Sequence, residues 1–268
     1  MDRLFEKKGF ICDMDGVIYH GNRLLPGVKE FLGWLKENDK KFLFLTNSGQ
    51  YTPRELQQKL GRLGLDVDES HFYTSALATA QFLNSQAPGC SAFVMGEHGI
   101  QNALYDVGIT YNDVNPDYVV VGEDRGYSLE MITKAIRLVN NGAKLIGTNY
   151  DLTGPTEDGI APACRALLAP IELTTGKQAY YVGKPNPPMM RTALKLLAVH
   201  SEEAAIIGDR MDTDIIAGIE SGLDTVLVLS GVTSREDCRR FPYRPRLILD
   251  GVGDIPKAAK ANGDFAAS

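Results

Sequence analysis

The sequence predicts an α/β protein in which helices cover both faces of a mainly parallel sheet. Three observations lead to this prediction. Short apolar runs alternate with amphipathic helical patterns along most of the chain. Polar residues directly follow several of these apolar runs. The alternation breaks near residues 86–89, restarts, and opens a third phase near residue 180, so the 268 residues divide into three phases.

The first apolar run, Gly9 to Cys12, has the length of a short buried strand and ends in two acids, Asp13 and Asp15. Gly16 then permits a sharp turn. Ligands of open α/β sheets bind outside the carboxyl ends of the strands, so this stretch brings two carboxylates to such a position. The alternative is an Asp-rich turn without a ligand. The spacing argues against an EF-hand loop, because glycine directly follows the second acid.

The first phase continues with a hairpin around Gly21-Asn22 and with helices and strands in alternation. Proline at the start of a helix and a capping box at Thr52 mark two of the helix starts. The expected strands are 41–45 and 72–74, and the expected helices are 26–35, 52–64 and 75–85.

The second and third phases repeat the same alternation. In the second phase we expect strands at 92–95, 118–121 and 144–147, helices at 98–107, 128–141 and 162–168, and a loop at 154–159. In the third phase we expect strands at 204–207, 225–229 and 247–249, a helix at 187–199, and a helix that carries Asp214 and ends at 221.

Composition excludes several classes of protein. The formal net charge is −6, from 28 basic and 34 acidic residues, which argues against binding to a nucleic acid polymer but not against a small anionic substrate. No apolar run approaches the ~18 residues of a membrane span. The four cysteines are far apart in the sequence, which favours reduced thiols over disulfides or a zinc site. We therefore expect a cytoplasmic protein that contacts no membrane.

Polar groups follow four of the predicted strands or turns, and their order along the chain is informative. The residues are Asp13, Asp15, Thr46, Lys184, Asp209 and Asp214. Singly, each has an ordinary structural interpretation: a helix cap, a surface lysine, a turn residue or a solvated helix face. Together they indicate one site at the carboxyl edge of a sheet.

These residues lie in motifs that resemble the four motifs of haloacid dehalogenase-like phosphatases. The motifs are Asp13-Met14-Asp15-Gly16-Val17, Leu45-Thr46-Asn47, Gly183-Lys184-Pro185 and Gly208-Asp209-Arg210-Met211-Asp212-Thr213-Asp214. The NagD branch, with its class IIA cap, is similar also at 72–76, 113–117 and 227–232. The resemblance implies a doubly wound, Rossmann-like core at 1–85 and 179–268, and an inserted α/β cap at 86–178.

The resemblance also implies a reaction. The chain would be a Mg²⁺-dependent phosphomonoesterase in which Asp13 attacks phosphorus and forms an aspartyl-phosphate. Asp15 would act as general acid and then as general base. Mg²⁺ would be held by Asp13, Asp209 and the backbone carbonyl of Asp15. Lys184, Thr46, Asn47 and Ser48 would bind the phosphoryl group, and Asp214 would orient Lys184 or a water on the metal.

Substrate choice is expected to lie in the cap. The stretch Gly147-Thr148-Asn149-Tyr150-Asp151 resembles the cap loop of the family, although Tyr150 replaces a usual proline. Asn149, Tyr150 and Asp151 would then contact the leaving group; the alternative is a polar turn after a strand. The expected substrates are nucleoside 5'-monophosphates.

Other functions remain open at this point. The rival substrates are sugar phosphates, phosphoglycolate and pyridoxal phosphate, and a non-catalytic protein that binds phosphorylated metabolites is the alternative of another class. P-loop and dinucleotide-binding patterns are absent from the sequence. The sequence leaves the choice between monomer and homo-oligomer undecided.

Overall fold

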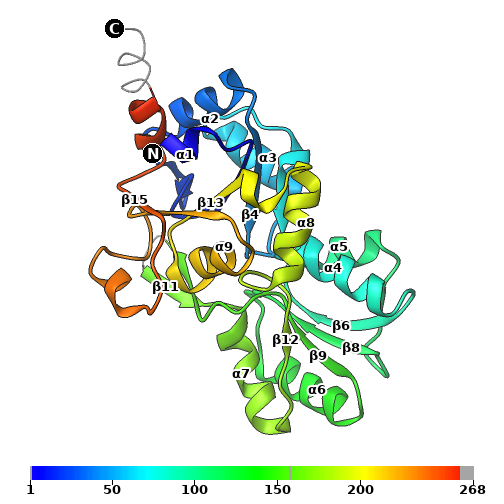
Figure 1. The fold of residues 1–268 in the computed structure, drawn as a ribbon. Coiled ribbons are helices and arrows are strands. Elements are labelled where there is room, and N and C mark those ends of the chain that lie inside the picture. Colours follow the sequence, from blue (N-terminus) through cyan, green and yellow to red (C-terminus); the bar gives the residue numbers. More distant parts are fainter. Residues whose placement is uncertain (1, 157–158, 260–268) are drawn as a thin grey trace, which may run out of the picture. The chain divides into compact units, whose positions relative to one another are not determined.

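The computed structural model describes residues 2–156 and 159–259 (Figure 1). The chain forms two compact units. The first unit contains Met1–Leu45, Lys59–Phe72 and Met190–Ser268, and the second contains Thr46–Gln58 and Tyr73–Met189. These limits differ from the boundaries expected for a core and a cap, which stay a prediction; residues 260–268 of that expected core lie outside the described residues.

The first unit is built on a six-stranded sheet in the order β15-β14-β13-β1-β4-β5. The pairings of β1 with β13 and β4, and of β14 with β13 and β15, are all parallel. The strands span Gly9–Cys12 (β1), Lys41–Thr46 (β4), Phe72–Thr74 (β5), Ala204–Gly208 (β13), Asp224–Val228 (β14) and Leu247–Leu249 (β15). Each expected strand of this sheet is therefore confirmed.

Helices α2 (Val28–Glu37) and α9 (Ile216–Glu220) lie on opposite faces of this sheet (Figure 1). Trp34 of α2 packs edge-on against Phe10 of β1, with ring centroids 5.6 Å apart. Gly218 of α9 lies against Ile206. Ile206 pairs with Ile11, which is next to Phe10 in β1 and therefore points to the opposite face of the sheet. The sheet is thus covered on both faces, as a doubly wound fold requires.

The remaining elements of this part of the chain are short or cross from one unit to the other. The hairpin at Gly21 pairs β2 (Tyr19–His20) with β3 (Arg23–Leu24). The other elements are α1 (Asp2–Phe5), α3 (Pro53–Arg62), α8 (Pro187–Leu197), and the short helical turns Glu69–His71, Ser201–Glu203 and Asp237–Arg240. At the start of α3, Thr52 and Glu55 form the expected capping box, with bonds of 2.9 and 3.3 Å.

The second unit contains a parallel five-stranded sheet in the order β12-β9-β8-β6-β7. Its strands span Ser91–Met95 (β6), Thr110–Tyr111 (β7), Tyr118–Val121 (β8), Lys144–Gly147 (β9) and Tyr180–Tyr181 (β12). Its helices are α4 (Ser75–Gln86), α5 (His98–Asp106), α6 (Leu129–Asn140) and α7 (Cys164–Thr175).

One face of this sheet packs against α6 and α7 (Figure 1). Alternate side chains of the central strands, such as Phe93 and Val119, form a buried cluster with Leu138 of α6 and with Leu168 and Ile171 of α7. The second unit therefore has a hydrophobic core of its own.

One expectation about the second phase of the sequence is wrong, and another is right about the helix but wrong about its bounds. The loop expected at 154–159 overlaps two paired strands, β10 (Thr153–Thr156) and β11 (Gly159–Pro162); residues 157–158 lie outside the described part. Because β11 is largely exposed, it lacks the apolar alternation that marks a half-buried strand. The helix expected at 162–168 runs instead from Cys164 to Thr175, past Pro170, because Ile171 beyond the proline is fully buried against the sheet.

The polypeptide after β13 begins its helix in an unusual form. Met211–Ile215 is a π-helix that continues into α9. Such wide turns are frequent at functional sites. Among the described residues, no helix combines the length and apolar character needed to cross a membrane.

Candidate active site

Three carboxylates meet at the carboxyl edge of the sheet in the first unit. Asp13 follows β1, and Asp209 and Asp214 follow β13. One carboxylate oxygen from each lies within 4.8 Å of the other two. β1 and β13 are parallel neighbours, so the end of each strand delivers its acid to the same place.

Backbone groups hold these three acids in position. The Asp13 N–H continues the strand ladder by donating to the Ile207 carbonyl at 2.8 Å. Asp209 Oδ2 accepts a hydrogen bond of 2.6 Å from the Val232 N–H, and Asp214 Oδ2 accepts one of 3.2 Å from the Arg210 N–H. These hydrogen bonds hold the side chains of Asp209 and Asp214 in fixed orientations.

Glycines make room for the acidic cluster. A Cβ atom at Gly231 would lie 2.0 Å from Asp209 Oδ2, and one at Gly208 would lie 2.2 Å from the Cβ atom of Asp214. Any side chain at these positions would displace the acids. Carboxylate oxygens are the ligands that Mg²⁺ prefers, so the cluster is compatible with a divalent cation of this kind.

The side chain of Asp15 is not one of the three grouped carboxylates. The chain turns at Gly16, whose φ of +79° is a conformation that glycine adopts readily. Asp15 Oδ1 instead lies 3.4 Å from His20 Nδ1 of the hairpin. Burial raises the pKa of Asp15, and His20 and Lys59 oppose that shift. A carboxyl group with a raised pKa is suited to donating a proton.

The second unit joins two of the predicted phosphoryl-binding residues, Asn47 and Lys184. Asn47 Oδ1 accepts a hydrogen bond of 2.7 Å from the Lys184 N–H, and Asn47 Nδ2 donates one of 3.0 Å to the Lys184 carbonyl. Lys184 is buried, with 2% of its surface exposed. The same amide also donates to Asp151 Oδ2 at 3.1 Å. These contacts fix the backbone from which the Lys184 ammonium group extends.

Thr46 and Ser48 flank Asn47 in a compact turn. The Ser48 N–H donates to Thr46 Oγ1 at 3.1 Å, and Thr46 is buried. Thr46 is the last residue of β4, and Asn47 and Ser48 follow it directly, so the polar stretch stands at the end of this strand as the sequence predicts. We call residues 46–49 the β4 loop.

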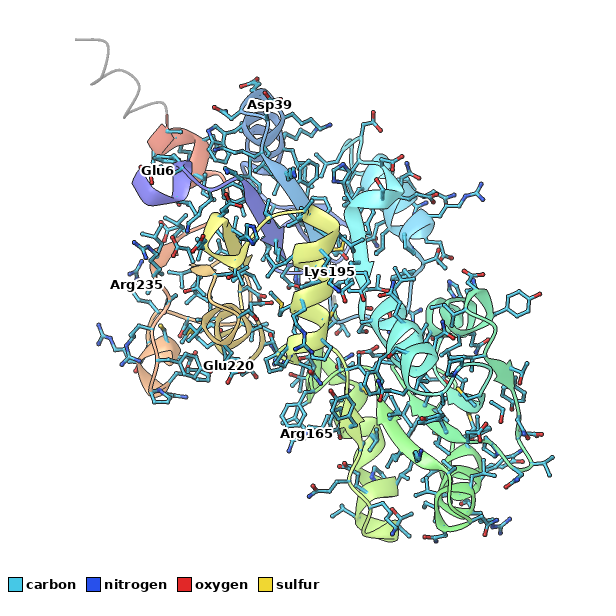
Figure 2. All side chains as sticks on the ribbon, turned by 45° about the vertical axis from the view of Figure 1, so that its right-hand side comes forward. Glu6, Asp39, Arg165, Lys195, Glu220 and Arg235 are labelled. Atoms are coloured by element: carbon cyan, nitrogen blue, oxygen red, sulfur yellow. The ribbon has the colours of Figure 1, made fainter. Side chains whose placement is uncertain are left out.

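Two neighbouring residues of the expected cap loop, Asn149 and Tyr150, differ in burial. Asn149 is fully buried, and its Nδ2 donates to the Asn47 carbonyl and to Glu123 Oε1, each at 2.7 Å. Tyr150 is 43% exposed, and the guanidinium carbon of Arg165 lies 4.0 Å from the centre of its ring. Figure 2 labels Arg165, which belongs to the first turn of α7.

Glu123 contacts the predicted site residue Asn149, although the sequence did not single it out. It follows β8 as Asn149 follows β9, at the carboxyl edge of the second sheet. Its place just after a strand end is the signal that also marks Asp13 and Asp209.

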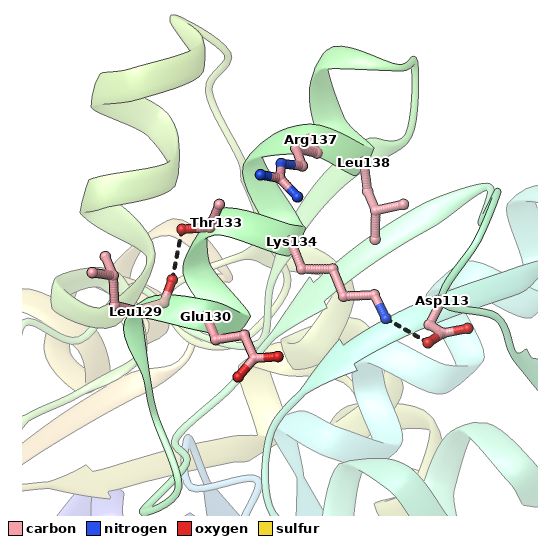
Figure 3. Close-up of a pocket in the computed structure, with 7 residues that line it drawn as sticks. All are labelled: Asp113, Leu129, Glu130, Thr133, Lys134, Arg137 and Leu138. Atoms are coloured by element: carbon pink, nitrogen blue, oxygen red, sulfur yellow. Dashed lines mark hydrogen bonds and ion pairs between the residues drawn. The ribbon is translucent and has the colours of Figure 1, made fainter.

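A cavity of about 730 Å³ lies elsewhere in the second unit, over α6 (Figure 3). Its lining residues are Asp113, Leu129, Glu130, Thr133, Lys134, Arg137 and Leu138. None of these is a predicted site residue. Lys134 forms an ion pair with Asp113 across the cavity, as Figure 3 shows. This cavity therefore takes no part in the candidate site.

The sequence comparisons agree with the motifs. A family model described as haloacid dehalogenase-like hydrolase matches residues 10–110, and a second HAD hydrolase-like model matches 181–255. The chain is 46% identical to the ribonucleotide monophosphatase NagD of Escherichia coli over 248 residues, which cover 92% of this chain and 98% of that protein. The chain belongs to the haloacid dehalogenase-like hydrolases.

Two further comparisons place it among the phosphatases of this family. It is also 46% identical to a dihydroxyacetone phosphatase of Corynebacterium glutamicum, over 92% of this chain and 90% of that one. The solved structure of a 4-nitrophenylphosphatase from Thermotoga maritima has a TM-score of 0.91 at 33% identity, with 95% of this chain and 98% of that chain covered. The predicted family, fold class and enzyme class, a phosphatase of the haloacid dehalogenase-like hydrolases, are confirmed.

Proposed function

We propose that this haloacid dehalogenase-like phosphatase hydrolyses nucleoside 5'-monophosphates, with Mg²⁺ as cofactor and through an aspartyl-phosphate on Asp13. The main support is the grouping of Asp13, Asp209 and Asp214 within 4.8 Å at the edge of a parallel sheet. The 46% identity to a protein named ribonucleotide monophosphatase supports the substrate class.

In the proposed reaction, a carboxylate oxygen of Asp13 attacks phosphorus while the bond from phosphorus to the ester oxygen breaks. Asp15 gives its proton to the departing oxygen. Water then attacks the phosphorus of the aspartyl-phosphate, Asp15 takes a proton from that water, and the Asp13 carboxylate is restored as inorganic phosphate leaves. The raised pKa of Asp15 fits the first of its two roles.

Asp13, Asp209 and the backbone carbonyl of Asp15 would hold the cation, and Asp214 would support it from the same cluster. Bound Mg²⁺ supplies positive charge that offsets the repulsion between a carboxylate and a phosphate ester. The glycines at 208 and 231, where any side chain would displace Asp214 and Asp209, support this assignment.

Lys184, Thr46, Asn47 and Ser48 would bind the phosphoryl oxygens. A buried lysine on a backbone fixed by two hydrogen bonds is pre-organised to stabilise developing negative charge. We also propose that the core catalyses the reaction and that the cap selects the leaving group. Tyr150 and Asp151 would contact the leaving group. We also place the enzyme in the cytoplasm, which its four free cysteines favour.

A second candidate substrate class is the phosphates of small sugars and trioses. The chain is 46% identical to a dihydroxyacetone phosphatase and 46% identical to a ribonucleotide monophosphatase, so sequence identity supports the two substrate classes equally. Phosphate release from a panel of nucleoside monophosphates, dihydroxyacetone phosphate, sugar phosphates, phosphoglycolate, pyridoxal phosphate and 4-nitrophenyl phosphate, measured with Mg²⁺, separates the two. The highest kcat/KM for a triose or sugar phosphate would contradict the nucleotide proposal, and no release from any ester would indicate a binding protein.

A further inference from the structure

We infer that Glu123 is a positioning residue that holds the β4 loop in the conformation that binds the phosphoryl group. This inference rests on the proposed role of the β4 loop in binding phosphate. Glu123 acts through Asn149 on one side of the loop and directly on Gly49 on the other.

The two carboxylate oxygens of Glu123 have different partners. Oε1 accepts a hydrogen bond of 2.7 Å from Asn149 Nδ2, and Oε2 accepts one of 3.4 Å from the backbone N–H of Gly49. Residue 49 follows β4, residue 123 follows β8 and residue 149 follows β9, and all three belong to the second unit. One side chain thus links the β4 loop to the ends of two strands of the sheet.

Asn149 carries the constraint to the centre of the loop. Its amide donates to the Asn47 carbonyl at 2.7 Å, and Ser75 Oγ donates to the same carbonyl at 2.5 Å. This carbonyl fixes the peptide plane between residues 47 and 48. The side chain of Asn47 in turn bonds to the N–H and carbonyl of Lys184. Glu123 is therefore connected through two side chains to the lysine that would stabilise the phosphoryl group.

The chemistry of this position favours an acceptor on both sides. Burial raises the pKa of Glu123, and the nearby Asp151 raises it further, whereas the hydrogen bonds from Asn149 and Gly49 lower it. Burying a carboxyl group costs free energy of desolvation, and hydrogen bonds to both of its oxygens offset part of this cost. Because both oxygens already accept from the protein, we assign Glu123 to positioning rather than to contact with the substrate.

This role makes a specific prediction about substrates. A residue that holds the phosphoryl-binding loop should affect every phosphate ester alike, whatever its leaving group. A residue that reads the leaving group should affect nucleotides and leave 4-nitrophenyl phosphate unchanged. The two roles are separated by comparing leaving groups.

The test is Glu123→Gln, which keeps the shape of the side chain but replaces one acceptor oxygen with an NH₂ group. We expect kcat/KM to fall about 10- to 100-fold. The factor should be the same for a nucleoside monophosphate, a triose phosphate and 4-nitrophenyl phosphate. The inhibition constant of inorganic phosphate should rise in parallel, and the Mg²⁺ concentration for half-maximal activity should not change. The matched control is Glu97→Gln, since Glu97 Oε1 accepts from the exposed Arg125 N–H.

Two results would overturn the inference: an unchanged inhibition constant for phosphate, or a loss confined to nucleotides. If Glu123→Gln does not fold, Glu123→Asp keeps the charge but is too short to reach both partners, and the same measurements apply. If the wild-type enzyme hydrolyses no ester, the proposed function fails, and calorimetric titration with inorganic phosphate decides this inference alone. Weaker phosphate binding in the variant than in the wild type supports it, and equal binding overturns it.

Discussion

The side-chain amide of Asn149 donates a 2.7 Å hydrogen bond to the backbone carbonyl of Asn47, a residue 102 positions away in the sequence. Both residues were predicted to bind substrate, Asn47 at the phosphoryl group and Asn149 at the leaving group. This hydrogen bond therefore connects the residue predicted to contact the leaving group with the residue predicted to bind the phosphoryl group. Because Asn149 is fully buried and its amide also donates to Glu123, we expect its mutation to disturb the β4 loop before it disturbs recognition of a base or sugar.

Replacing Asp13 with Asn should abolish turnover, with a fall in kcat of at least ~10⁴-fold, because the neutral amide cannot accept the phosphoryl group. The matched control is Asp212→Asn. Asp212 is an exposed acid of the same Asp-rich motif and is ion-paired with Arg210 at 3.1 Å. Steady-state assays with 4-nitrophenyl phosphate measure both variants. A near wild-type kcat in the Asp13 variant would remove it from the nucleophile role.

Replacing Asp15 with Asn should slow the hydrolysis of alkyl phosphates more than that of 4-nitrophenyl phosphate. A general acid contributes ~10²–10⁴-fold, and it matters most when the leaving oxygen is strongly basic. The measurement is the ratio of kcat for a nucleoside monophosphate to kcat for the nitrophenyl ester, in the variant and in the wild type. An equal loss for both esters would mean that Asp15 is not the acid.

Replacing Gly231 with Ala should raise the Mg²⁺ requirement without changing the fold of the sheet. The new Cβ atom would lie 2.0 Å from Asp209 Oδ2, so the carboxylate must move from the position in which it faces Asp13 and Asp214. Removal of metal with EDTA should stop activity in the wild type, and titration with Mg²⁺ should restore it.

The control for that experiment is Gly251→Ala, since a Cβ atom at Gly251 meets no other atom within 4 Å. We expect a half-saturating Mg²⁺ concentration at least about 10-fold higher for the Gly231 variant, as is typical when a contact that orients a metal ligand is lost. Identical Mg²⁺ dependence in the two glycine variants would argue against Asp209 as a metal ligand.

Much of the candidate site could be predicted because its chemistry follows strand ends. Asp13 and Asp209 come directly after buried apolar runs, and such runs are recognisable from their composition. The grouping of their side chains then follows from the parallel pairing of β1 and β13. Glu123 also stands at a strand end, two residues after β8, but the contacts that give it its role come from distant parts of the chain, which no local pattern reveals.

Two parts of the chain, α7 and the β10–β11 pair, contain residues that locally predict another structure than the one that packing and strand pairing produce. Pro170 predicts the end of a helix, yet α7 continues to Thr175 because Leu168 and Ile171 on either side of the proline are buried against the sheet. In the β10–β11 pair, Gly154 and Gly159 resemble turn residues, and Ile160 is 77% exposed. Strands stabilised by pairing alone lack the apolar alternation on which a sequence-based prediction depends.

The last prediction separates the two neighbouring residues Asn149 and Tyr150. Asn149→Ala should lower kcat/KM for all esters by a similar factor, because it releases the Asn47 carbonyl and Glu123 together. Tyr150→Ala should instead act on the leaving group. Tyr150 is 43% exposed, and its ring could stack on a base, a contact worth roughly 1–3 kcal/mol. We therefore expect KM for a nucleoside monophosphate to rise at least ~5-fold, with little change for 4-nitrophenyl phosphate.

The matched control for Tyr150 is Tyr180→Ala. Tyr180 is equally exposed, at 43%, but its ring stacks on Phe82 with centroids 4.9 Å apart. The deciding quantity is the ratio of kcat/KM between nucleotide and nitrophenyl ester. If that ratio is the same in the Tyr150 and Tyr180 variants, Tyr150 does not contact the leaving group. If it changes in the Asn149 variant alone, the buried amide rather than the exposed ring selects the substrate, and the hydrogen bond to Asn47 links that selection to the β4 loop.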